Sequence, residues 1–94
     1  MFVQEMKNII KYAIELDIDY LESFLGYEGD KVLKIITKHE DVIDLLEAFI
    51  KNLGLASKSE YEIKGKHGPH YSLYVGVEDT SVYHLKKDEH FNLN

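Results

Sequence analysis

Histidine is the residue type whose clustering in this chain could do chemistry. The sequence has 5 histidines, and most of them follow residue 66: His67, His70, His84 and His90. His67 and His70 share a short loop, where two imidazoles and a carboxylate could bind zinc or nickel. Nothing in the sequence places His84 near that loop, and no cysteine supplies a thiolate. We therefore expect no metal and no other cofactor, and interpret these histidines as exposed loop residues.

Sequence motifs for catalysis are missing. Gly26 and Gly29 are isolated, and no Gly-Lys-Ser or Gly-Lys-Thr follows them, so a phosphate-binding loop is not expected. The serines, threonines and histidines that could act as nucleophile or base are scattered along the chain. We predict that the protein is not an enzyme.

Charge favours a protein partner over nucleic acid. The chain has 17 carboxylates and 11 basic residues, for a net charge of -6. All the basic residues are lysines, so no guanidinium group is present to form paired hydrogen bonds with phosphate or guanine. A protein that a polyanion repels overall needs a local basic face to bind one.

Composition is that of one globular domain. Hydrophobic residues make up 45% of the 94 residues and charged residues 30%, values at which a chain can bury a core. The missing cysteines, the lack of a long apolar run and an N-terminus unlike a signal peptide together favour the cytoplasm. We expect a single domain over 1–94.

Apolar spacing in the first half of the chain is typical of helices. The 3, 4, 3, 4 spacing from Phe2 to Ile14 gathers apolar side chains on one stripe. Asp19 and Asp30 can each cap a further helix, and Thr37 with Glu40 forms a capping box. We predict a helical part over 1–55 with helices at about 2–16, 20–25, 30–37 and 38–53.

The second half changes to a period of two, which is typical of strands. Tyr71, Leu73 and Val75 alternate with polar residues, and glycine-containing and acidic segments separate the apolar runs. We predict a three-stranded antiparallel β-meander within 60–87, followed by a flexible tail. The fold class is α+β, with strands at about 60–65, 71–77 and 82–86 and the tail at 88–94.

Residues 18–37 resemble the helix-turn-helix of the winged helix-turn-helix superfamily. The residues at matching spacing are Leu21, Leu25, Gly26, Tyr27, Val32 and Ile35. Glu22 departs from the pattern, because a small residue is usual there. The resemblance implies a DNA-binding transcriptional regulator that acts as a dimer, with the hairpin as the wing. Its DNA-binding residues would be Lys31, Lys34, Lys38, Lys64, Lys66, His67 and His70.

A cluster of carboxylates points to a different kind of partner. Glu40, Asp41, Asp44 and Glu47 lie within two turns of one expected helix. Helix stability explains part of this acidity, since carboxylates favour a helix N-terminus and Glu47 can pair with the lysine four residues later. It does not explain Asp44, which repels Glu40 one turn earlier.

One aromatic residue completes the expected docking surface. Tyr74 should lie on the outer face of the sheet, where it would anchor a partner. We predict a small acidic, non-enzymatic regulatory or inhibitory protein that binds a protein partner with a basic surface. A phage or mobile element is the origin that an arginine-free composition favours, and a homodimer is compatible with this interpretation. The DNA-binding regulator is the alternative.

Overall fold

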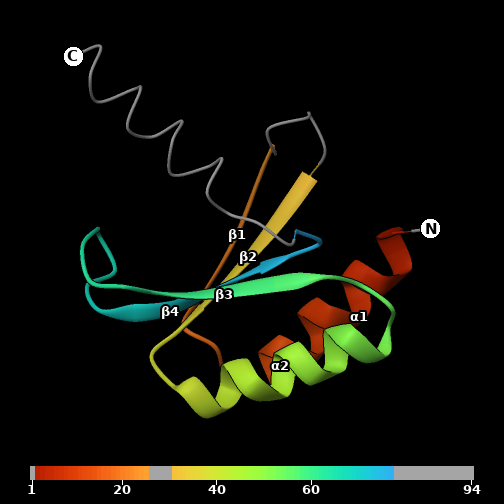
Figure 1. Cartoon of the computed structure of the whole chain (residues 1–94), viewed down its shortest axis with the longest axis horizontal. Helices are drawn as coiled ribbons and strands as arrows, with labels where there is room; N and C mark the ends of the chain where they lie inside the picture. Colours follow the sequence, from red (N-terminus) through yellow and green to blue (C-terminus); the bar gives the residue numbers. More distant parts are fainter. Residues whose placement is uncertain (1, 26–30, 78–94) are drawn as a thin grey trace.

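The computed structural model describes residues 2–25 and 31–77. They form an α+β fold of two helices and a four-stranded antiparallel sheet (Figure 1). In chain order the elements are α1 (Phe2–Glu15), β1 (Tyr20–Leu25), β2 (Lys31–Thr37), α2 (Glu40–Asn52), β3 (Ser57–Glu62) and β4 (His70–Val75).

The sheet joins two β-hairpins through its central strands. The strand order is β1-β2-β4-β3, so β1 and β3 are the edges and β2 pairs with β4. Leu33 lies opposite Val75 and Ile35 opposite Leu73 in this central pair. Both helices lie on the same face of the sheet (Figure 1), which leaves a second face that we call the helix-free face.

The core lies between the two helices and the central strands. Ile9 and Ala13 of α1 are fully buried, as are Leu46 and Ile50 of α2. The apolar stripes predicted for the first and fourth helices thus pack on the sheet, and α1 and α2 confirm the helices expected over 2–16 and 38–53. Tyr71 is partly buried against this core. The core positions on the sheet are Leu33, Ile35, Leu73 and Val75.

The helices predicted over 20–25 and 30–37 are wrong, because these segments form β1 and β2. Val32, Ile35 and Ile36 are β-branched, and strands accommodate that side-chain shape better than helices do. Strand β2 is buried on both faces, so its apolar residues run without alternation. Such a short apolar run fits a buried strand and a helix equally well by periodicity.

The residues that resemble a helix-turn-helix therefore include an antiparallel strand pair. Phe24 lies opposite Val32 and Leu21 opposite Ile35. Asp19, expected to cap a helix, instead accepts a hydrogen bond from the backbone N–H of Lys38 at 2.9 Å. It thereby fastens the start of β1 to the end of β2.

The observed sheet differs from the prediction in its number of strands and in where they lie. The sheet has four strands instead of three, since β1 and β2 add to β3 and β4. Strand β3 begins at Ser57, inside a segment whose sequence resembles a polar link, because an edge strand accepts serine and lysine. The strand expected over 82–86 and the tail over 88–94 lie outside the described residues. Neither α1 nor α2 is long and apolar enough to cross a membrane.

Substitutions at two adjacent leucines of α2 would test how this helix packs on the sheet. Replacing the fully buried Leu46 by alanine should lower the free energy of unfolding by about 2 to 5 kcal/mol, because a cavity would remain under the sheet. The Leu45→Ala variant is the matched control, since Leu45 is 48% exposed and should cost under about 1 kcal/mol. Urea unfolding measures both, and equal losses would contradict this packing.

Candidate functional site

The helix-free face carries a polar network centred on Glu62. The Ser72 hydroxyl donates a hydrogen bond to Glu62 Oε2 at 2.6 Å, and Lys34 Nζ lies 3.4 Å from the same oxygen. His70 Nε2 lies 3.9 Å away. The four residues come from β2, β3 and β4, so the network spans three adjacent strands.

Glu62 is held in its ionised form. Burial raises the pKa of its carboxyl, but the Ser72 hydrogen bond and the Lys34 ammonium outweigh burial and hold the pKa below its ordinary value. Lys34 is itself only 9% exposed, so its positive charge and the negative charge of Glu62 offset each other's cost of burial. We interpret this pair as a structural element of the sheet.

A second cluster attaches the β3–β4 loop to β1. His67 Nε2 lies 3.0 Å from Glu22 Oε2 and Lys66 Nζ lies 3.8 Å from it. The His67 ring also lies against the Tyr20 ring, with centroids 4.2 Å apart. The hydrogen bond from His67 is the largest cause that holds the pKa of Glu22 below its ordinary value. The loop therefore crosses the helix-free face from one hairpin to the other.

The expectation that Tyr74 is an exposed anchor is wrong. Its side chain points to the helix-free face as predicted, yet only 3% of the residue is exposed. The Phe24 ring meets it edge-on at 6.3 Å, and Lys34 Nζ lies 5.3 Å from its ring centroid. Burial first, and then the charge of Glu62, raise the pKa of its phenol. Alternation along the strand indicated the face but could not indicate what covers it.

The chemistry of these clusters does not resemble a catalytic centre. Ser72 is fully buried and its hydroxyl donates to a carboxylate, so a substrate cannot reach the oxygen. His70 Nδ1 is 2.6 Å from the carbonyl oxygen of Gly68, which makes Nδ1 the donor. In residues 2–25 and 31–77, no three histidine, aspartate or glutamate side chains are grouped to hold a metal ion.

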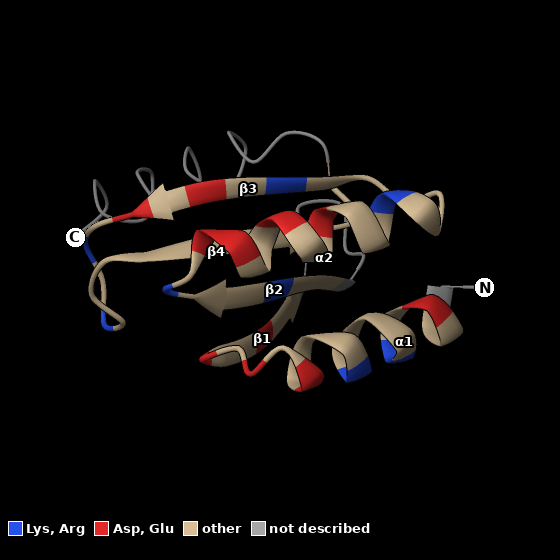
Figure 2. Ribbon diagram, turned by 90° about the horizontal axis from the view of Figure 1, so that it is seen from below, with Lys and Arg blue, Asp and Glu red and all other residues tan. Residues whose placement is uncertain are grey.

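The carboxylates predicted to bind a partner form one acidic face on α2. Glu40, Asp41 and Asp44 are exposed and Glu47 is half-buried. Figure 2 shows these acidic positions along the side of α2 that turns away from the sheet, with the acidic end of α1 and its following loop nearby. The structure thus brings this part of the predicted site together on one surface.

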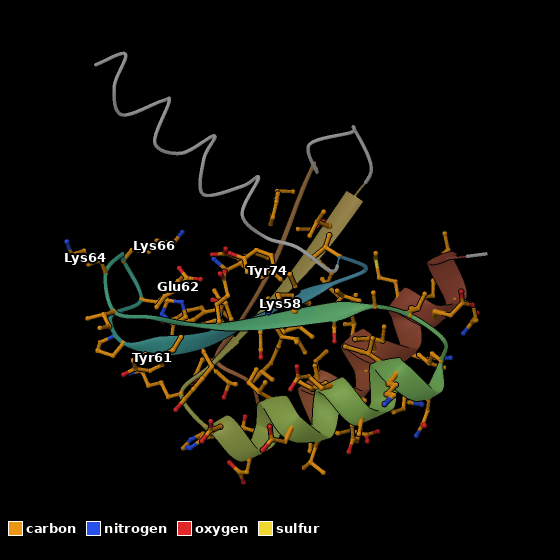
Figure 3. All side chains as sticks on the ribbon, in the orientation of Figure 1. Lys58, Tyr61, Glu62, Lys64, Lys66 and Tyr74 are labelled. Carbon is orange, nitrogen blue, oxygen red and sulfur yellow. The ribbon has the colours of Figure 1, made fainter. Side chains whose placement is uncertain are left out.

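Tyrosines at the border of the acidic face were not identified as site residues from the sequence. Tyr61 and Tyr71 have ring centroids 4.9 Å apart, and Tyr61 is 56% exposed. Burial, and next the carboxylate of Glu40, raise the pKa of Tyr71; Asp44 adds to the effect. Figure 3 shows Tyr61 on the α2 side of β3 and Tyr74 on the other side. Strand alternation places Tyr61 on the same face as Tyr71, but the sequence could not show that α2 leaves its ring exposed.

The predicted DNA-binding residues are spread over several elements. Lys34 is buried in β2, whereas Lys38 is exposed just after that strand. Lys64 and Lys66 are exposed in the β3–β4 loop, where Figure 3 shows them. The remaining positions are Lys31 in β2, the half-buried His67 and the buried His70. Neither α1 nor α2 carries any of these groups, so their placement gives DNA binding no support.

Comparison with protein-family models, with curated proteins and with solved structures finds no match to this chain. The function must therefore be argued from the residues and their geometry.

The Lys34–Glu62 pair can be tested by a double-mutant cycle. Glu62→Gln should destabilise the protein by about 3 kcal/mol, because it leaves the Lys34 ammonium buried without its carboxylate. Adding Lys34→Met should recover part of that loss, because no charge then remains uncompensated. Urea unfolding of the four proteins measures the coupling, and strictly additive losses would show that the two charges do not interact.

Acid should unfold the protein partly through these carboxylates. Glu22 and Glu62 both have lowered pKa values in the folded chain. Each contributes stability that is present above the unfolded pKa of about 4.3 and is lost as the pH falls through the lower folded pKa. The free energy of unfolding should therefore drop below about pH 4, and less steeply in Glu62→Gln. The same slope in that variant would contradict the assignment.

Proposed function

We propose that this protein is a small, non-enzymatic regulator or inhibitor that binds a basic surface of another protein. The docking surface is the acidic face of α2, defined by Glu40, Asp41, Asp44 and Glu47, with Tyr61 at its border. The observation that carries this proposal is the gathering of these carboxylates on the outer side of one helix (Figure 2).

The carboxylates of this face are not neutralised by ion pairs within the described residues. Among the ion pairs between residues 2–25 and 31–77, none involves a carboxylate of α2. Within those residues, the pair expected between Glu47 and Lys51 is not formed either. Carboxylates that form no ion pair within the described residues can interact with cations from outside, and their summed field steers a basic partner toward the face.

Tyr61 supplies what the carboxylates cannot. An exposed aromatic ring adds apolar contact area and can accept a lysine or arginine side chain over its face. The neighbouring Glu40 and Asp44 charges already act on Tyr71, whose ring contacts that of Tyr61. A cationic side chain placed at Tyr61 would therefore lie close to negative charge.

The helix-free face is a weaker candidate for this role. Its central charged groups are already paired, with Lys34 at Glu62 and His67 of the β3–β4 loop at Glu22. Its central aromatic residue, Tyr74, is buried. A partner that docked on this side would have to break pairs that already exist.

A fluorescent oligolysine peptide is a suitable probe of the acidic face. At low salt the protein should bind it, and added salt should weaken binding. The double variant Glu40→Gln/Asp44→Asn should lose about 1 kcal/mol of binding free energy, which is several-fold in affinity. Fluorescence anisotropy measures this change.

The control is a double variant that raises the net charge by the same amount at positions outside the acidic face. Asn8 and Asn52 are exposed, so the double variant Asn8→Lys/Asn52→Lys matches the charge change without touching the carboxylates of α2. It should retain most of the affinity, and Tyr61→Ala should reduce it. An equal loss in the control, or no binding of oligolysine at low salt, would overturn the proposal.

A further inference from the structure

The two edges of the sheet differ in how well they are protected against pairing. Strand β3 has the sequence SKSEYE, and its charged residues Lys58, Glu60 and Glu62 are what natural edge strands use to prevent association. Strand β1 has the sequence YLESFL and a single charged residue, Glu22, whose carboxylate is already engaged by His67. Among the described residues, β1 pairs with β2 alone.

Apolar side chains lie exposed along the β1 edge. Tyr20 and Leu21 of the strand are 51% and 39% exposed. On α1, Val3 and Ile14 are 66% and 65% exposed, and their spacing places them on one side of the helix. Tyr12 stacks on Phe49 of α2 from a different side of α1, so the Val3–Ile14 side turns away from α2. Figure 2 shows α1 beside β1, with β3 at the opposite edge.

We propose that β1 pairs with β1 of a second copy of this chain, in antiparallel orientation, to form a symmetric dimer with one continuous sheet. A twofold axis perpendicular to the sheet keeps the helices of both copies on the same face. The exposed flank of one α1 then adjoins that of the other, and apolar surface leaves water along the whole edge.

Charge selects the register of this pairing. Residues directly opposite in an antiparallel pair share a face, so the axis must pass midway between the two copies of one β1 residue. An axis at Glu22 would place two carboxylates opposite each other. An axis at Ser23 keeps most of the strand paired, and sets Leu21 opposite Leu25 of the second copy and Glu22 opposite its Phe24. The small, exposed Ser23 then lies opposite its own copy across the axis.

A chain without cysteine allows a direct test of this register. Two Ser23→Cys chains would bring their new thiols together on the axis, where opposite Cα atoms are within the roughly 4.4 to 6.8 Å that a disulfide spans. Mild oxidation should give a covalent dimer on a non-reducing gel. Ser59→Cys on β3, a serine on the same face of the sheet at the opposite edge, is the control and should stay largely monomeric.

The oligomeric state of the unmodified chain completes the test. Sedimentation velocity should show a concentration-dependent monomer–dimer equilibrium, which Ser23→Lys and Ile14→Lys abolish and Ser59→Lys retains. Ile14 is exposed, so its variant should keep the circular dichroism spectrum and the unfolding midpoint of the parent. A monomer at all concentrations, or equal cross-linking of the Ser23→Cys and Ser59→Cys variants, would overturn the proposal. So would a dimer that survives Ser23→Lys.

Discussion

The burial of β2 on both of its faces is the constraint on which the rest of the structure depends. Leu33 and Ile35 pack under the helices, while Val32 and Ile36 are just as deeply buried on the helix-free face. Lys34 lies on that second face, and an ammonium group there would be costly without a counter-charge. Glu62 of β3 supplies that counter-charge, with its Oε2 3.4 Å from Lys34 Nζ.

How much of the fold the sequence predicts depends on how many faces an element buries. Helices α1 and α2 bury one stripe each, so their period is visible from Ile9 and Ala13 or from Leu46 and Ile50. Strand β4 alternates in its side-chain types, and its position was also found within a residue or two. Strand β2 has no alternation, and Asp19 and Asp30 stand where N-terminal caps of helices would stand in the sequence. For that reason the β1–β2 hairpin was not predicted.

The candidate site also contains residues that local spacing predicts and residues that it does not. The carboxylates of α2 could be predicted, because helical spacing alone gathers Glu40, Asp44 and Glu47 on the solvent side. Tyr74 and Lys34 could not be placed correctly, since their burial depends on contacts with residues distant in the sequence. Tyr61 was missed because its exposure beside the acidic face depends on how α2 packs on the sheet, which local pattern does not encode.

The contact of His67 with Glu22 joins residues 45 positions apart in the chain. The hairpins β1–β2 and β3–β4 can each close locally, but their union through β2 and β4 encloses α2 and has a larger entropic cost of chain closure. Refolding of this domain should accordingly be limited by the docking of two preformed halves. The β3–β4 loop, which reaches from one half to the other, would be among the last parts to reach its native position.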